Sequence, residues 1–132
     1  MNFTKTTSYS LNVLAFMSKH STDRLSANYL HNKLDIPYSY LRQVLHELSE
    51  NGFINGAKGR NGGFTFSRDV NTIFISEIID STEGLESFNR CIMGFDKCPF
   101  DGECPMHPVW EKTRNEILEV LKKTTLAELS LK

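Results

Sequence analysis

The chain has 132 residues, 39% of them hydrophobic, and a formal net charge of −1, which fits one globular domain or one domain with an appendage. No stretch approaches the roughly 20 apolar residues of a membrane span, and the first residues lack the apolar core of a signal peptide. We therefore expect a cytoplasmic protein with no membrane contact. An odd number of cysteines, three, argues against a disulfide framework in that reducing compartment.

The charge is distributed unevenly along the chain. Residues 1–70 carry eight Lys and Arg against five Asp and Glu, whereas residues 71–132 carry seven against eleven. A basic first half indicates a surface that faces a polyanion, although either imbalance is also compatible with solvated surface.

The first half predicts a helix-turn-helix. Apolar residues recur at helical spacing over residues 9–19, Ser26 caps a short second helix, and Pro37 suits the first turn of a third helix that ends at Gly52. The third helix buries one face, formed by Leu41, Val44, Leu45 and Leu48. Two helices around a tight turn, the second longer than the first, form this motif.

The opposite face of the third helix is polar at its start. Such a position lets side chains reach base edges in the major groove, where arginine recognises guanine and glutamine recognises adenine. A solvated helix face with no ligand is an equally good interpretation of this segment alone. Our candidate DNA-contacting residues on this helix are Ser39, Tyr40, Arg42 and Gln43.

A glycine-rich segment after this helix predicts a β-hairpin wing. Residues 53–55 and 64–66 are strand candidates, and five of the eight glycines lie from Gly52 to Gly63. Lys58 and Arg60 stand in the loop between the strands, and a slim basic tip suits a DNA minor groove. The alternative is a flexible surface hairpin. No Gly-Lys-Ser/Thr follows the glycines, which excludes a Walker-type phosphate loop.

The second half predicts a short helix at 76–81, an irregular segment at 84–104, and a long helix from Pro105 or Pro108 to about Lys123. A capping box at Thr125 and Glu128 opens a final turn. The apolar stripe of the long helix either packs on its own domain or forms a dimer seam, and we favour the dimer because a dimer spans two half-sites.

All three cysteines lie in the irregular segment, with the spacing Cys91-x6-Cys98-x5-Cys104-x2-His107. Structural zinc usually uses closely spaced cysteine pairs, so this spacing is poor for zinc. Separated thiolates in one loop suit an iron–sulfur cluster, and His107 is a candidate fourth ligand. Unligated cysteines or a redox thiol pair are the alternative.

No catalytic constellation is present, because the carboxylates are scattered and no nucleophile is paired with a histidine. We therefore expect a protein that is not an enzyme.

In this order, the segments resemble the Rrf family of winged-helix transcription regulators, with its IscR- and NsrR-like members. The resemblance spans essentially the whole chain. It is carried by "SYLRQVLHELSENGFI" in the recognition helix, "AKGRNGGF" in the wing, "CIMGFDKCPFDGECPMHPVW" in the cysteine loop and the closing "TTLAEL".

The resemblance implies a homodimer that binds palindromic, double-stranded promoter DNA and holds an iron–sulfur cluster that senses iron, redox state or nitric oxide. Cys91, Cys98, Cys104 and His107 stand at ligand positions, and Arg60 stands at a minor-groove position. Arg42 replaces a glutamate of IscR-like members, so the recognised sequence should differ. Ser8 replaces the carboxylate ligand of four-iron members, so the two-iron and four-iron types both stay open.

The predicted fold is mainly α-helical with a β-hairpin wing and a long C-terminal dimerisation helix. The predicted units are a DNA-binding domain at 1–83, a cluster loop at 84–107, and a dimerisation helix with a final turn at 105–132. The predicted function is a cluster-controlled regulator, most simply a repressor. The alternatives are a regulator of the same fold that uses thiol oxidation or zinc, and a protein-interaction or electron-carrier module that does not bind DNA.

Overall fold

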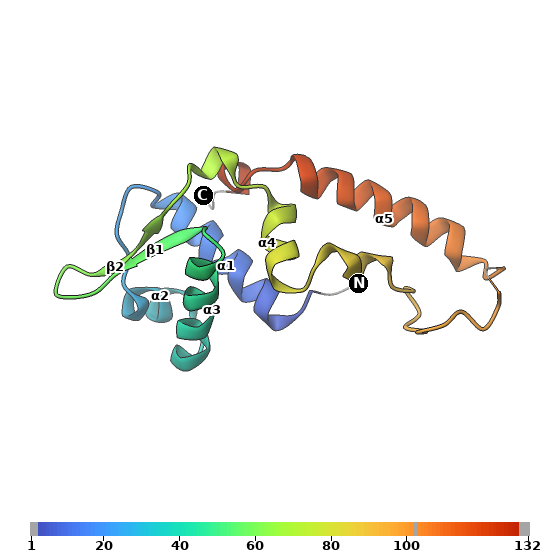
Figure 1. Cartoon of the computed structure of the whole chain (residues 1–132), viewed down its shortest axis with the longest axis horizontal. Helices are drawn as coiled ribbons and strands as arrows, with labels where there is room; N and C mark the ends of the chain where they lie inside the picture. The colour runs from blue at the N-terminus through green and yellow to red at the C-terminus, as the bar shows by residue number, and fades with distance from the viewer. Residues whose placement is uncertain (1–2, 102, 130–132) are drawn as a thin grey trace.

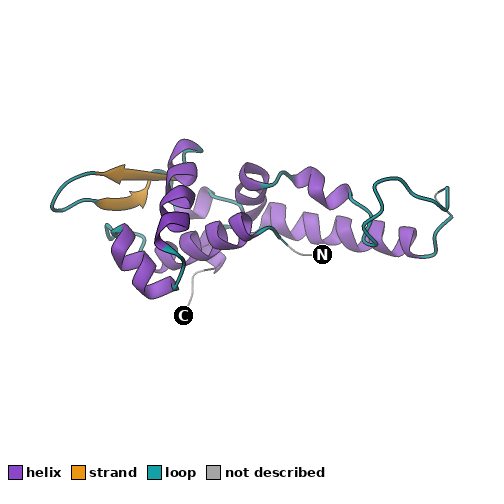
Figure 2. Ribbon diagram, turned by 90° about the horizontal axis from the view of Figure 1, so that it is seen from below, coloured by secondary structure: helices purple, strands orange, loops and turns teal. Residues whose placement is uncertain are grey.

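The structure is a computed structural model that describes residues 3–101 and 103–129 of the chain. This part contains five α-helices and a two-stranded antiparallel hairpin, so the predicted mainly helical, winged fold is confirmed. The elements are α1 (Lys5–Lys19), α2 (Ala27–Leu34), α3 (Tyr38–Glu50), β1 (Ile54–Ala57), β2 (Gly63–Phe66), α4 (Ile75–Thr82) and α5 (Met106–Lys123). The molecule is elongated, with the hairpin at one end and the loop before α5 at the other (Figures 1 and 2).

The first two helices begin at side-chain caps, and the third begins after a proline. The hydroxyl of Thr4 accepts a hydrogen bond from the backbone N–H of Thr7 at 3.2 Å, so α1 begins four residues earlier than predicted. Ser26 caps α2 as predicted, accepting from the N–H of Tyr29 at 3.1 Å. Pro37 lies one position before α3, because its ψ of 132° is extended.

The end of α3 is a Schellman motif. The N–H of Phe53 donates to the carbonyl of Leu48, and the N–H of Gly52 donates to that of Ser49, both at 3.1 Å. Gly52 has a φ of +83°, which glycine adopts without the steric penalty of a Cβ atom. Because Phe53 and Leu48 are both buried, this motif fixes the direction in which the chain enters β1.

The wing is a short hairpin, and Leu25 pairs with its second strand through an isolated antiparallel bridge. Ile54 pairs with Phe66 and Ala57 pairs with Gly63, so the strands lie within two residues of the prediction. Phe64 also exchanges two backbone hydrogen bonds with Leu25, at 2.8 and 3.1 Å. A Cβ atom on Gly63 would stand 2.8 Å from the carbonyl oxygen of Leu25, so only glycine permits this approach.

The C-terminal half folds back onto the helical core. Ile75, Ile78 and Ile79 of α4 are buried as predicted, and Leu126, beyond α5, is fully buried in the same core. One half of the predicted capping box is present, because the side chain of Glu128 accepts from the N–H of Thr125 at 3.0 Å, while the N–H of Glu128 bonds the backbone carbonyl of Thr125. Thus α5 returns its C-terminal end to the winged helix while its N-terminal end projects away (Figure 1).

We expect the Gly52→Ala variant to be destabilised by about 1–2 kcal/mol, because an alanine at positive φ strains the backbone. Nothing lies within 4 Å of the added Cβ atom, so the loss reports the backbone alone. Urea unfolding followed by circular dichroism measures it. Gly52→Asn should lose less stability, because asparagine tolerates a positive φ. Equal stability of the native protein and both variants would contradict the positive φ of Gly52.

Candidate nucleic-acid interface and cysteine pocket

The recognition helix α3 presents two distinct faces. Leu41, Val44, Leu45 and Leu48 are each at most 1% exposed, as the apolar pattern predicts. Ser39, Arg42 and Gln43, in the first two turns, are exposed on the other face. These side chains project from the molecular surface at the start of the helix, where a groove-reading helix carries its contacts.

Tyr40 differs from its neighbours, because it faces α1. Its hydroxyl lies 2.6 Å from the Thr6 hydroxyl, and its ring packs edge-to-face on that of Tyr9 with centroids 5.1 Å apart. The side chain is half-buried. Tyr40 therefore braces α3 against α1, and its DNA contact stays a prediction.

The wing exposes its two basic side chains, and a third basic residue lies beside them. Lys58 and Arg60 are exposed in the loop between β1 and β2. Arg24, which sequence reasoning missed, donates to the carbonyl of Asn61 at 3.4 Å and lies against Gly63. It reaches the wing because Leu25 pairs with β2, a tertiary contact that no local sequence signal announces.

The cysteine loop runs from Arg90 to Pro105 and is anchored at both ends to α5. The indole N–H of Trp110 donates to the carbonyl of Arg90 at 2.8 Å, and Trp110 is only 8% exposed. The N–H of His107 donates to the carbonyl of Cys104 at 3.1 Å. Near the loop start, the N–H of Gly94 bonds the carbonyl of Cys91 at 3.0 Å. The described residues at both ends of the loop are thus fixed to the first turns of the helix.

The four predicted ligands line one pocket. Cys91, Cys98, Cys104 and His107 all contribute to the wall of an open pocket of about 810 Å³ between the loop and α5. The three thiols are free and half-buried. Among residues 3–101 and 103–129, no three Cys, His, Asp or Glu side chains converge closely enough to hold a metal ion. The four candidate ligands therefore line one pocket, but their donor atoms are too far apart to bind a single metal ion.

The chemistry of this pocket fits an anionic iron–sulfur cluster. The three cysteine sulfurs are soft ligands of the kind that iron–sulfur clusters use. The N–H of Met93 donates to the sulfur of Cys91 at 3.4 Å, as backbone groups around such clusters do. Arg114 lines the same pocket, and its Nε is buried with no hydrogen-bond partner in the described part of the chain. The positive charge of Arg114 favours an anion in this pocket.

Glu83 ties the start of α1 to the segment that leads into the loop. One carboxylate oxygen accepts from the N–H of Thr4 at 2.8 Å and from the hydroxyl of Thr7 at 2.9 Å. The other oxygen accepts from the hydroxyl of Ser87 at 3.1 Å. Partial burial acts to raise the pKa of Glu83, but these hydrogen bonds outweigh it and hold the pKa below the ordinary 4.5. Sequence reasoning missed this residue, because its partners are distant in the chain.

Within the described residues, no helix combines the length and apolar character that a membrane crossing requires.

A helix-turn-helix with an exposed polar recognition face and a basic β-hairpin defines a winged-helix DNA-binding protein. The profile of the Rrf2 family, described as an iron-dependent transcriptional regulator, matches residues 3–131. The chain belongs to this family, and it is a DNA-binding transcriptional regulator, not an enzyme.

The similarity extends over whole chains. The regulator NsrR of Shouchella clausii is 31% identical over 136 residues, covering 99% of this chain and 89% of that protein. Two solved structures share the fold: CymR, the global cysteine regulator of B. subtilis (TM-score 0.77, 23% identity, 98% and 96% of the chains), and T. potens IscR (TM-score 0.74, 23% identity, 98% and 85%).

The Glu83 network predicts a pH-dependent contribution to stability. Since the pKa of Glu83 is lowered in the folded protein, its stabilisation is complete above the unfolded value near 4.5 and is lost as the pH falls through the folded value. Between pH 7 and pH 3, the native protein should lose more unfolding free energy than Glu83→Gln, measured by urea denaturation. The exposed Glu86→Gln is the control. The network is refuted if the three pH profiles are parallel.

Proposed function

We propose that this regulator binds palindromic promoter DNA as a homodimer and that an iron–sulfur cluster in the cysteine pocket sets its affinity. One observation carries the cluster: Cys91, Cys98, Cys104 and His107, separated in sequence, line a single pocket together with the cation of Arg114. The family description as iron-dependent and the NsrR relative support the same proposal. As a repressor of promoters, the protein would act in the cytoplasm.

In this proposal, α3 enters the major groove and the wing follows the adjacent minor groove. Arg42 and Gln43 would contact base edges, because they are exposed in the first two turns of the helix, and Ser39 would contact the nearby backbone or a base. Lys58 and Arg60 would contribute phosphate and minor-groove contacts. Arg24 lies beside the wing and would add a phosphate contact.

The dimer would form along α5. Trp110 is the one side chain of this helix that is buried among its described residues, while Ile117, Leu118 and Leu121 pack against the core from one side. Val109 and Val120 are 59% and 62% exposed. They are three helical turns apart and so share a face, which matches an apolar stripe on a second copy of the helix.

The cluster would be held by the three thiolates, with His107 or a residue of the second protomer as the fourth ligand. Nε2 of His107 lies 3.5 Å from the Glu111 carboxylate, one turn further along α5. A ligating histidine commonly directs one ring nitrogen to a carboxylate and leaves the other for the metal. When bound, the cluster supplies a redox- and nitric-oxide-reactive centre. The loop must close further to bring the sulfurs together, because no three donors converge among the described residues.

Thiol-based sensing is the second candidate. The three free thiols are partly exposed and share one pocket, so oxidation could join two of them without a metal. The fold is also that of Staphylococcus aureus CymR, which was solved in an oxidized form (TM-score 0.77, 21% identity). Iron and sulfide content and the visible spectrum of anaerobically purified protein separate this candidate from the cluster.

We expect Gln43→Ala to lose roughly 1–3 kcal/mol on the cognate site and little on random DNA, because a bidentate base contact is removed. Lys58→Ala should instead weaken binding to all sequences and reduce the salt slope by about 1. Fluorescence anisotropy with duplexes at several salt concentrations measures both. The exposed Lys19→Ala, at the end of α1, is the control. Equal losses of Gln43→Ala on both duplexes would reassign this residue to backbone contact.

We expect each single Cys→Ser variant to lose the visible absorbance of the cluster, because the three thiolates form one ligand set. Lys97→Gln, exposed beside Cys98, should retain it. Removing the cluster from native protein with nitric oxide or a chelator should change promoter affinity by about 5- to 150-fold, the usual range for two coupled sites. Identical affinities before and after removal would show that the cluster does not control DNA binding.

A further inference from the structure

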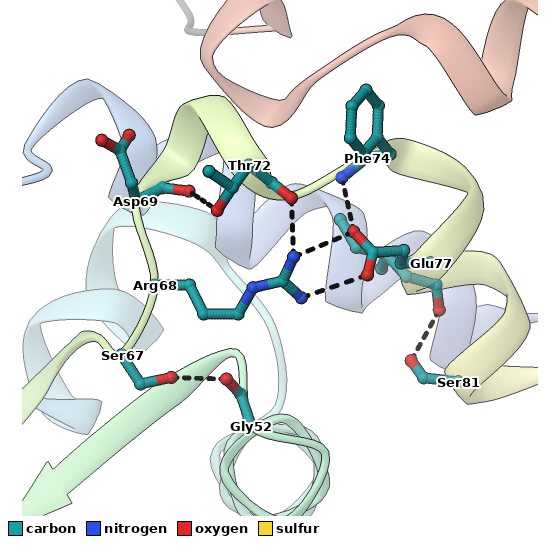
Figure 3. A network of polar contacts seen from close by, with 9 residues as sticks. Gly52, Ser67, Arg68, Asp69, Thr72, Phe74, Glu77 and Ser81 are labelled. Carbon is teal, nitrogen blue, oxygen red and sulfur yellow. Dashed lines mark hydrogen bonds and ion pairs between the residues drawn. The ribbon is translucent and has the colours of Figure 1, made fainter.

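The base of the wing is held on two sides, where the chain leaves β2. On the first side, the N–H of Ser67 donates to the carbonyl of Phe53 at 3.1 Å, and its hydroxyl donates to the carbonyl of Gly52. These contacts join the wing to the end of the recognition helix. The next residue, Arg68, turns to the opposite side and reaches α4 (Figure 3).

Arg68 forms a bidentate ion pair with Glu77. Its two terminal nitrogens lie 3.2 Å from the two carboxylate oxygens, and one of them also donates to the carbonyl of Thr72 at 2.6 Å. Glu77 in turn accepts from the N–H of Phe74 at 2.9 Å. Figure 3 shows the guanidinium enclosed between Thr72 and Glu77. This geometry fixes direction as well as distance, since a guanidinium paired through two bonds cannot rotate freely.

The segment that receives this ion pair is bound on its other side to the end of α5. The N–H of Ile75 donates to the carbonyl of Thr124 at 3.0 Å, and the N–H of Leu126 donates to that of Ile73 at 2.7 Å. Phe74 and Thr125 form the resulting antiparallel bridge. The ion pair thus connects the wing to the segment 73–75, and backbone hydrogen bonds connect that segment to the end of the long helix.

We propose that Arg68 and Glu77 are positioning residues that set the direction of the wing, so that Glu77 controls how Arg60 engages the minor groove without touching DNA. The inference rests on the proposed wing contact. The proposal also implies that Arg68 does not contact DNA phosphates, because its guanidinium is already bonded to the Thr72 carbonyl and the Glu77 carboxylate. Lys58 and Arg60 at the tip then carry the electrostatic attraction of the hairpin.

The charge state of Glu77 agrees with this role. Partial burial acts to raise its pKa, but the Phe74 N–H and the Arg68 guanidinium outweigh it and hold the pKa below the ordinary 4.5. The carboxylate is therefore ionised at neutral pH, which is the state that pairs with Arg68.

A double-mutant cycle between Glu77→Gln and Arg60→Ala tests the proposal. The DNA is a duplex selected by the native protein from random sequences, with A/T-rich flanks. We expect Glu77→Gln to weaken binding roughly 2- to 10-fold, a usual size for coupled residues. In the Arg60→Ala background, the same substitution should weaken binding by a clearly smaller factor, because one of the two basic wing side chains through which it acts is absent.

Three outcomes would overturn the proposal. Equal weakening by Glu77→Gln in both backgrounds would mean a general loss of folding or of another contact, and no weakening at all would mean that the ion pair does not position the wing. If Arg60→Ala alone leaves affinity unchanged, the wing does not bind DNA and the inference fails with the proposed wing contact. The separate Arg60→Ala arm distinguishes this last result from the other two.

Arg68→Lys provides a second variant, because it keeps the charge but loses the bidentate geometry. It should repeat the Arg60-dependent weakening of Glu77→Gln, while its salt slope stays at the native value. A salt slope reduced by about 1, as expected for Lys58→Ala, would show that Arg68 contacts a phosphate and would contradict the proposal. Glu86→Gln, exposed on the turn after α4, is the control, and thermal unfolding of each variant verifies that it is folded.

Discussion

The burial of one face of α3 is the constraint on which the DNA-facing surface depends. Leu41, Val44, Leu45 and Leu48 are almost completely enclosed, and burying each such side chain contributes up to about 1.5–3 kcal/mol. With that face fixed, helical geometry leaves no choice about which side chains face outward. The same burial includes Phe53, through the Schellman motif with Leu48, and so it also determines where the wing leaves the helix. Recognition helix and wing are therefore two outcomes of a single packing arrangement.

Patterns within the sequence predict those parts of the fold that are decided locally. The apolar period of α3, the cap at Ser26, the glycine at the helix end and the capping box at Glu128 each depend on neighbours a few residues away. The missed features all involve distant partners. Glu83 bonds residues of α1, Leu25 pairs with Phe64, and the Tyr40 hydroxyl meets that of Thr6. Likewise, the cysteine spacing indicates a type of ligand set, but the approach of the sulfurs depends on how the loop closes on α5.

The functional surfaces lie at opposite ends of an elongated molecule. The wing stands at one end and the cysteine loop at the other, and α5 runs between them (Figure 1). A physical account of coupling between two sites needs an element that both sites bias, and α5 lines the pocket at one end and is bonded at the other to the segment that contacts the wing base. Its first turns carry His107 and Trp110 beside the pocket, whereas its end is hydrogen-bonded to the strand segment around Phe74. From there the Arg68–Glu77 ion pair reaches the base of the wing.

This arrangement gives a physical reason for placing an anionic cofactor where the cysteines are. The N-terminal end of α5 carries partial positive charge, and the cationic residue Arg114 lines the same pocket. An iron–sulfur cluster held by three thiolates is negatively charged, so both features would stabilise it in the pocket. A disulfide between two of the thiols is neutral and would gain little from either feature. If α5 shifts when the loop closes on a cluster, the segment around Phe74 and the wing base bonded to it must adjust, because hydrogen bonds join each step. The cluster would then act on DNA through the direction of the wing as well as through the spacing of the two recognition helices.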